Sequence, residues 1–339
     1  MIRYLTQRLA MMIPTLLGIS VAVFLMIQLV PGDPAQVILG ERATPESLKL
    51  LRQELGLDQP VYVQLGRDLG GLLTGDLGRS IKSHTAVSDD LLARFPATFE
   101  LTVVSMLFAC AIGVSIGVLS AVRRGTVLDA IGMTASLAGV SMPIFWLGLV
   151  MIMTFAVDFG LFPVSGRTSA FTYIPTVTGL LLVDSLIAGD LAAFGDVLHH
   201  LVLPGITLGT VPAAVIVRMT RSSVLEVIQE DYIRTASAKG LSERIVIVRH
   251  ALRNASIPVV TVVSLQFGYL LGGAVITETI FAWPGVGRWL LLAVHARDFP
   301  VIQGGVLVVA VTFVMINLMA DIVYAWLDPR ISYQSRERS

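Results

Sequence analysis

The chain has 339 residues, of which 55% are hydrophobic and 14% are charged, and its mean hydropathy is +0.79. Soluble domains carry about 25% charged residues, so this composition excludes a soluble protein and indicates an integral membrane protein. The formal net charge is zero, so the chain has no overall electrostatic field that would attract anionic partners. The only cysteine is Cys110, which excludes a disulfide within the chain.

Six stretches without charged residues are long enough, or nearly so, to cross a bilayer, which takes about 20 residues. They are 9–30, 101–122, 130–157, 201–217, 254–277 and 299–320. We therefore predict an all-α polytopic membrane protein with six transmembrane helices. The first stretch is expected to be an uncleaved anchor, because it exceeds a signal peptide's apolar region and lacks a small-residue cleavage site. The third is long enough to bend around Ser141-Met142-Pro143, and the fourth, with Pro204 and Pro212, is expected to be kinked and extended by its flanks.

The distribution of basic residues predicts that both termini are cytoplasmic. The inner segments would be 1–8, 123–129, 218–253 and 328–339, which carry 14 of the 24 Lys and Arg residues. The outer segments would be 31–100, 158–200 and 278–298, which carry 10 over about twice the length. A seventh span at 168–183 would place the arginine-rich segment 218–253 outside, and we reject it for that reason.

The segment 31–100 is expected to be a small extracytoplasmic helical piece. Thr44 and Pro45 are suited to the N-cap and first position of a helix, and Gly56 is suited to its end. One apolar face is expected from Leu48, Leu51 and Leu55.

The segment between the fourth and fifth stretches is too long for a simple connector, which needs about 2–8 residues. Helix formers run without interruption from Val224 to Ala238, and Gly240 is expected to end that helix. Ser242 can cap a second helix through Glu243 to Arg253. Small residues at the corner, Ala236, Ser237 and Ala238, would let a partner approach the backbone. The alternative is an amphipathic helix on anionic headgroups, which the acidic residues Glu226, Glu230, Asp231 and Glu243 weaken.

This corner resembles the EAA loop of permeases from binding-protein-dependent ABC importers. Gly240 matches the family's fixed glycine, and Arg234-Thr235-Ala236 stands at the Glu-Ala-Ala position. The two changed residues of the triplet, and the larger distance from Gly240 to Pro258, resemble the peptide and nickel branch. Further segments in the same order resemble that branch: Val30-Pro-Gly-Asp-Pro34, Gly75-Asp-Leu-Gly78, Ser141-Met-Pro-Ile-Phe-Trp146, Pro163-Val-Ser-Gly-Arg167, Arg218-Met-Thr-Arg-Ser-Ser223, Glu278 to Arg288 and Asp328-Pro-Arg330.

The resemblance implies a type I ABC importer permease fold and a role as a non-enzymatic subunit that imports dipeptides or short peptides. Nickel complexes, glutathione-like peptides and longer peptides remain alternative substrates. The implied partners are a second homologous permease, two ATPase subunits that hold ATP and Mg, and an extracytoplasmic peptide-binding protein in a bacterial inner membrane. The implied organisation is an anchor span 1–30, an outer segment 31–100, a permease core 101–330 with a coupling loop 218–253, and a tail 331–339.

The residues implied to couple this chain to the ATPases are Tyr232, Thr235, Ala236, Lys239 and Gly240. A turn after the fifth stretch is a candidate outer gate or dock for the binding protein, through Glu278, Phe281, Trp283 and Pro284. The equal alternative for its aromatic residues is an anchor at the membrane interface. Asp321, an acid near the inner end of the sixth stretch, is either functional or solvated at the helix end.

Other chemistry is not supported by the sequence. No G-x-x-x-x-G-K-[ST] motif is present, so any ATP chemistry must come from a partner. Gly113-Val-Ser115-Ile-Gly117 has a nucleophile pattern but lies within a span, where small residues serve helix packing. No metal-ligand or cofactor motif stands out. An ion-coupled secondary transporter would need charges near the middle of the spans, and none is there.

Overall fold

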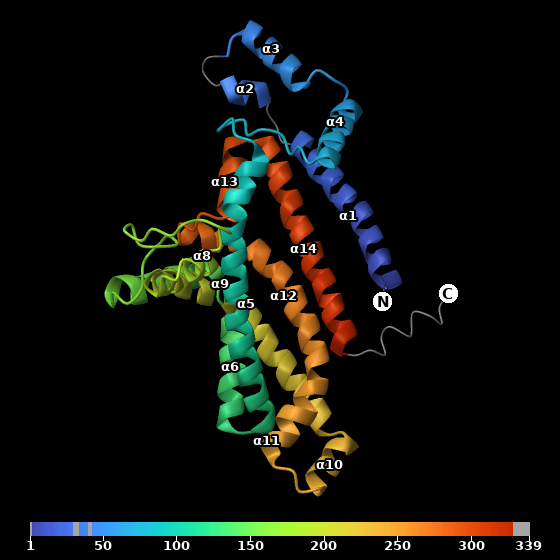
Figure 1. The fold of residues 1–339 in the computed structure, drawn as a ribbon, viewed down its shortest axis with the longest axis vertical. Coiled ribbons are helices and arrows are strands. Elements are labelled where there is room, and N and C mark those ends of the chain that lie inside the picture. Colours follow the sequence, from blue (N-terminus) through green and yellow to red (C-terminus); the bar gives the residue numbers. More distant parts are fainter. Residues whose placement is uncertain (1, 30–33, 40–42, 328–339) are drawn as a thin grey trace. The chain divides into compact units, whose positions relative to one another are not determined.

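The structure, a computed structural model, describes residues 2–29, 34–39 and 43–327. Within these residues it consists of helices and loops, with one isolated bridge between Arg79 and Ala86 (Figure 1). The prediction of an all-α fold is confirmed. Five of the described helices are long and apolar enough to cross a membrane, and a sixth crossing is formed if a sharply bent pair counts as one. Most of the Val30–Pro34 motif, Asp328-Pro-Arg330 and the tail 331–339 lie outside the described residues.

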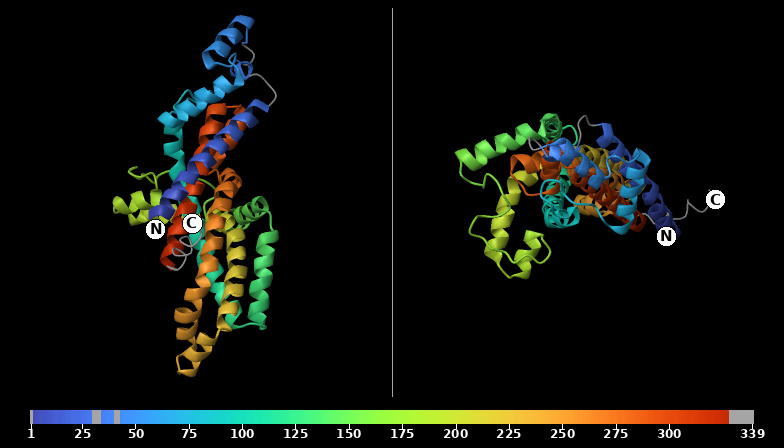
Figure 2. Two further views of the ribbon diagram at one scale, coloured as in Figure 1. Left: turned by 90° about the vertical axis from the view of Figure 1, so that its right-hand side faces the viewer. Right: turned by 90° about the horizontal axis from the view of Figure 1, so that it is seen from above.

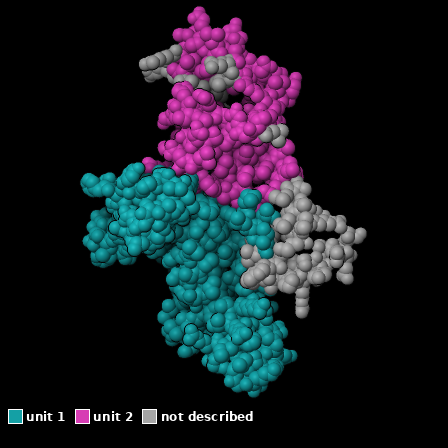
Figure 3. Space-filling view, viewed as in Figure 1, with its two compact units in different colours: residues 1, 96–287, 315–339 teal, residues 2–95, 288–314 magenta. Residues whose placement is uncertain are grey.

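The chain forms two compact units, which are coloured separately in Figure 3. Unit 1 comprises residues 1, 96–287 and 315–339, and unit 2 comprises residues 2–95 and 288–314. The divisions fall within three helices, α5 (Val87–Val122), α13 (Val286–Ala296) and α14 (Phe299–Leu327). Helix α5 begins at Val87, well before the predicted stretch 101–122. Its first turn, which carries Asp89 and Asp90, is continuous with the apolar part of the helix.

Helix α9 (Leu191–Ile228) is the central helix of unit 1. It contacts α6 (Val127–Ser141), α7 (Ile144–Met151), α8 (Leu181–Ile187) and α12 (Leu252–Ile280). Helices α9 and α12 run side by side in the views of Figures 1 and 2. Of the most apolar 18 residues of α9, 72% are buried within the structure. Protein rather than lipid therefore surrounds most of this part of the helix. The predicted extension of the stretch 201–217 by its flanks is confirmed.

Glycines bring α5 and α9 close together. A Cβ on Gly117 would lie 2.6 Å from Thr220 Cβ, and a Cβ on Gly209 would lie 2.6 Å from the carbonyl oxygen of Ser105. Real Cβ atoms essentially never approach that closely. The interpretation of Gly113 and Gly117 as packing residues is therefore confirmed, and the core leucines of both helices are buried beside this contact.

The third predicted stretch is broken rather than straight. Met142 and Pro143 have extended backbone angles, and α6 and α7 meet at 105°. Proline lacks an amide hydrogen and disfavours helical backbone in the residue before it, so the predicted bend is confirmed and is sharp. Beyond α7 the helix continues as the π-helix η2 (Ile152–Asp158). Residues 161–180 are non-helical, which agrees with the rejection of a seventh span.

Unit 2 contains α1 (Ile2–Leu29), α2 (Pro34–Leu39), α3 (Pro45–Leu55) and α4 (Val61–Thr74). The predicted ends of α3 are confirmed. Thr44 Oγ1 accepts from the amide of Ser47, and Ser47 Oγ accepts from the amide of Thr44, which is a capping box. Gly56 ends the helix with a φ of 70°, a left-handed conformation that favours glycine.

Unit 2 also contains a short hairpin around the bridge of Arg79 and Ala86. The buried carboxylate of Asp298 accepts from Ser80 Oγ (2.5 Å) and from the amides of Ile81 (3.1 Å) and Lys82 (3.2 Å). Three hydrogen bonds to one buried carboxylate fix this hairpin to the chain just before α14.

Candidate functional site

The loop between α9 and α12 contains a separate short helix. Helix α9 ends at Ile228, and α10 (Asp231–Ala238) begins after a break at Gln229 and Glu230. The prediction of one uninterrupted helix from Val224 to Ala238 is therefore wrong. No glycine or proline signals the break; the new direction lets α10 bury its apolar side against the rest of the loop.

Gly240 forms the predicted corner. Its φ is +77°, a conformation that side-chain-bearing residues rarely adopt. A Cβ built on it would meet no atom within 4 Å, so the backbone conformation, and not crowding within this chain, requires the glycine. The next helix, α11 (Glu243–Ile245), has Ser242 at its N-cap position but without a side-chain hydrogen bond. The chain then passes through the π-helix η3 (Val246–Ala251) into α12, so the predicted second helix is present as three consecutive pieces.

The loop has its own hydrophobic cluster. Ile233 and Ala236 of α10 are buried against Val246 and Ala251 of η3. Partly buried Val227 and Ile228 at the end of α9 complete the cluster. These contacts hold α10 against the end of α9 and against η3, which leads into α12 (Figure 1).

The five predicted coupling residues divide into two groups. Tyr232, Thr235, Lys239 and Gly240 are exposed on one side of α10 and the corner. Ala236 is only 8% exposed and faces the cluster, so its small side chain permits close packing within the loop and is not offered to a partner. The hydroxyl of Tyr232, which is 41% exposed, accepts a hydrogen bond of 2.6 Å from Asn254 Nδ2 at the start of α12.

An ion pair that the sequence analysis missed joins α9 to α6. Arg221 Nε and one terminal nitrogen bind the two oxygens of Asp129 at 2.7 and 2.8 Å. The amide of Gly125 donates to the same carboxylate at 3.0 Å. Asp129 is 6% exposed, and such a bidentate pair fixes both position and orientation. The two residues of the ion pair lie 92 positions apart in the sequence. The one sequence signal that could have suggested the pair is an arginine near the end of a long apolar helix.

The predicted gate turn after α12 is mostly buried. Glu278 and Trp283 are 0% exposed and Phe281 is 1% exposed, whereas Pro284 is exposed. Phe281 packs with Ala156 and Leu203 in unit 1. Buried aromatic residues cannot anchor in a lipid interface, so the anchor alternative does not fit the structure.

Hydrogen bonds hold this turn against the start of the unit 1 part of α5. Thr98 Oγ1 donates to Glu278 Oε1 at 2.6 Å and accepts from the amide of Val286 at 2.8 Å. Trp283 Nε1 donates to the carbonyl of Ala97 at 2.9 Å. A Cβ on Gly285 would lie 2.5 Å from Thr98 Oγ1 and would also overlap the carboxylate of Glu278. The turn is therefore held from several directions.

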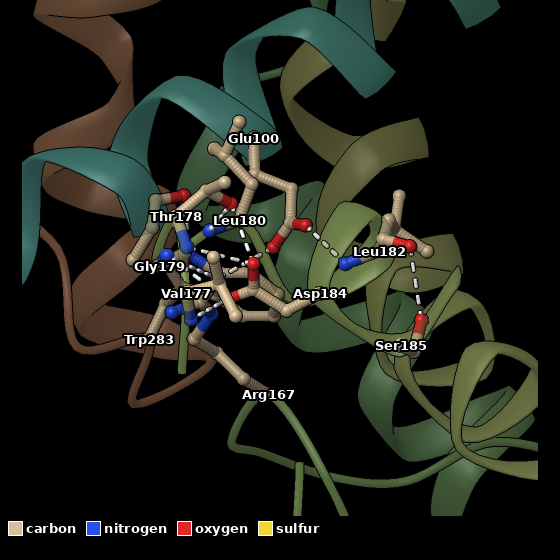
Figure 4. Close-up of polar contacts among 11 residues, drawn as sticks. Glu100, Arg167, Val177, Thr178, Gly179, Leu180, Leu182, Asp184, Ser185 and Trp283 are labelled. Carbon is tan, nitrogen blue, oxygen red and sulfur yellow. Dashed lines mark hydrogen bonds and ion pairs between the residues drawn. The ribbon is translucent and has the colours of Figure 1, made fainter. Parts of the chain in front are cut away.

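A second polar cluster fixes the long segment before α9, and Figure 4 shows it. Arg167 donates to Glu100 Oε2 at 2.6 Å and to the carbonyl of Gly179 at 3.0 Å. Its guanidinium lies 5.8 Å from the centre of the Trp283 ring, and Glu100 also accepts from the amide of Leu182 at 2.7 Å. The cluster thus connects the segment, α5 and the gate turn.

Asp184 fixes the fold of the same segment. Its carboxylate accepts from the amide of Thr178 (2.8 Å), the hydroxyl of Thr178 (2.7 Å) and the amides of Gly179 (2.9 Å) and Val177 (3.3 Å) (Figure 4). Burial raises the pKa of this carboxyl, but the hydrogen bonds from Thr178, Gly179 and Val177 outweigh it and hold the pKa below its ordinary value. The carboxylate therefore stays charged and ordered over the physiological range.

The side chain of Asp321 lies outside the described residues, so its predicted role stays a prediction.

The helical fold, the broken span and the exposed loop helix define a multi-pass membrane protein. Residues 113–333 match the family described as the inner membrane component of binding-protein-dependent transport systems, and residues 1–102 match its N-terminal region. The chain belongs to this family of permeases.

Two curated relatives cover the whole chain. The dipeptide transport system permease protein DppB of Escherichia coli (strain K12) is 49% identical over 338 residues, which span 98% of this chain and 100% of that protein. The glutathione transport system permease protein GsiC of Salmonella paratyphi A is 43% identical over 334 residues, with the same coverage. A structure of the MetNI methionine ABC transporter in an inward-facing conformation matches with a TM-score of 0.54 and 20% identity over 70% of this chain and 96% of that chain. That match concerns the fold, which is the predicted type I importer permease fold.

Proposed function

We propose that this chain is the transmembrane permease subunit of an ATP-driven importer of dipeptides or short peptides in a bacterial inner membrane. The observation that carries the proposal is the match of 49% identity to a dipeptide permease over the full length of both chains. A relative that is similar across every span and loop supports the same kind of cargo. Both termini would lie in the cytoplasm, in agreement with the distribution of Lys and Arg.

The proposed partners are a second homologous permease, two ATPase subunits and an extracytoplasmic peptide-binding protein. The sequence has no P-loop, so ATP and Mg would be held by the ATPases. Membership of a binding-protein-dependent family supports the requirement for a binding protein.

The loop helix α10 is the proposed contact with the ATPases. Its exposed side offers Tyr232, Thr235 and Lys239, and the Gly240 corner leaves the backbone open to a partner surface. The buried side, with Ile233 and Ala236, holds α10 to the ends of α9 and α12. Movement of the ATPases on ATP binding would therefore displace α9 and α12 together with α10.

The ion pair of Asp129 and Arg221 would extend this movement to α6. Because the pair is bidentate and mostly buried, α6 follows α9 instead of sliding past it. The proposed result is alternating access, in which one set of packed helices opens the pathway to either side.

The turn after α12 is the proposed outer gate or dock. Pro284 is its exposed residue, and the buried Glu278, Phe281 and Trp283 would hold it in place. Their role would thus be to position the turn, and contact with the binding protein would occur through its surface.

Purification from the native host tests the assembly. We expect a tagged chain to copurify with a second permease and P-loop ATPases, and the complex in liposomes to import a labelled dipeptide with ATP and the binding protein. Import driven by an ion gradient without ATP would contradict the proposal. Labelling of single cysteines in a Cys110→Ala background tests orientation: a cysteine replacing Lys239 should react only from the cytoplasmic side and one replacing Ser169 only from outside.

A glutathione-like peptide is the second candidate substrate, because a glutathione permease is 43% identical over the full chain. Competition by unlabelled glutathione and unlabelled dipeptide against the labelled dipeptide separates the two. Stronger competition by glutathione would favour the second candidate.

A further inference from the structure

The break between α6 and α7 opens a groove on the surface of unit 1. The groove has a volume of about 380 Å³ and is lined by residues 140–145, Val211 of α9, and Tyr269 and Ile276 of α12. Sites for small ligands measure about 300–1,000 Å³, so the groove has room for a ligand of dipeptide size.

The break leaves backbone groups without partners in their own helices. The amide of Met142 donates to Ala138 and the amide of Leu147 donates to Pro143. By helix geometry, the carbonyls of 139–142 and the amides of 144–146 then lack helical partners. Ser141, Met142 and Pro143 are exposed on the described chain. In a membrane such a break is tolerated only where protein covers it or where it lines a water-filled cavity, so lipid does not cover this groove.

One side of α12 continues the groove along the length of the helix. The exposed residues of this side recur every three or four positions and are Thr261, Leu265, Tyr269, Gly272, Ile276 and Thr279. A Cβ on Gly272 would meet no atom within 4 Å. This side of α12 is therefore open within the described chain, and Tyr269 and Ile276 join it to the groove.

The chemistry of the lining suits a peptide better than a tightly packed partner helix. Helix–helix contacts in membranes favour small residues that let backbones approach, whereas this groove has Met142, Phe145 and Tyr269 at its surface. Flexible methionine and aromatic surfaces accommodate varied side chains. Tyr269 is 45% exposed, and its hydroxyl makes no hydrogen bond within the described part of the chain.

We propose that this groove, with Tyr269 and the open backbone at 139–146, is a contact site for the main chain of a short peptide in the translocation pathway. The amide groups that all peptides share would pair with the Tyr269 hydroxyl and the open backbone. The apolar lining would accept different peptide side chains, which gives broad specificity. This inference rests on the proposed import of peptides and adds the residues that meet the cargo.

Photo-crosslinking in the assembled transporter tests the site. Tyr269→p-benzoylphenylalanine places a crosslinker in the groove, and Leu107→p-benzoylphenylalanine places one on an exposed apolar position of α5 as a matched control. During ATP-driven turnover we expect a radiolabelled dipeptide to crosslink at 269 and not at 107. Unlabelled dipeptides with other side chains should suppress the crosslink, and a free amino acid should not.

Kinetics of a minimal variant provide the second measurement. Tyr269→Phe removes only the hydroxyl, and loss of one hydrogen bond predicts a rise in the KM for peptide of roughly threefold to tenfold, with ATPase association unchanged. Crosslinking at 269 to the second permease or to lipid alone, or an unchanged KM, would overturn the site while leaving peptide import intact. Failure of the wild-type complex to import peptide at all would instead overturn the proposed function, and the inference with it.

Discussion

The substitution Gly240→Asp separates the corner's role in the chain from its role in the complex. Gly240 has a φ of +77°, and a Cβ there would touch nothing within 4 Å. This backbone conformation costs a residue with a side chain about 1–2 kcal/mol of conformational energy, and it costs Asp less than most residues. The folded chain should therefore lose about 1 kcal/mol or less. A carboxylate and side chain between α10 and an ATPase would meet a packed surface, so we expect ATP-driven uptake to fall by more than tenfold, which corresponds to about 1.4 kcal/mol or more.

Gly75→Asp is a matched control in unit 2. Gly75 has a φ of +79°, is also exposed, and a Cβ on it would also meet nothing within 4 Å. Thermal unfolding in detergent should change similarly in both variants, whereas copurification of ATPases and ATP-driven uptake should fall only in Gly240→Asp. Equal loss in both, or normal uptake and ATPase association in Gly240→Asp, would refute the assignment of the corner to coupling.

Three further predictions concern stability and coupling. Gly209→Ala should lower the free energy of unfolding by about 1–3 kcal/mol relative to Gly195→Ala on the same helix. The reason is that a Cβ at 209 would lie 2.6 Å from a backbone oxygen, whereas a Cβ at 195 would meet no atom within 4 Å. Equal melting temperatures of the two variants would contradict the close packing of α5 and α9. Asp129→Asn should lower the melting temperature because Arg221 loses its charged partner, and the exchange Asp129→Arg with Arg221→Asp should recover part of that loss in the same melting assay. Deletion of 44–56 should impair uptake and leave ATPase copurification intact; loss of the ATPases would mean that the orientation is inverted.

Features that depend on neighbouring residues could be predicted from the sequence. The limits of α3 follow from Thr44, Pro45 and Gly56, because a cap is formed by groups within one turn of the helix end. The bend at Pro143 and the corner at Gly240 follow from the backbone limits of proline and glycine. The membrane fold and the family followed in the same way, from apolar stretches and from an ordered series of motifs.

The partners of the buried charges could not be predicted from the sequence. Asp129 and Arg221 are 92 residues apart, and Glu100 and Arg167 are 67 apart, so only the packing of α6 on α9 and of the non-helical segment 161–180 on α5 decides that they meet. The burial of Ala236 and Trp283 was likewise decided by tertiary contacts, because a small or aromatic residue in a helix or turn is equally suited to a surface and to a core. Local backbone preferences act within a few residues and can therefore be predicted from the sequence. Burial and ion pairing depend instead on which distant helices pack together.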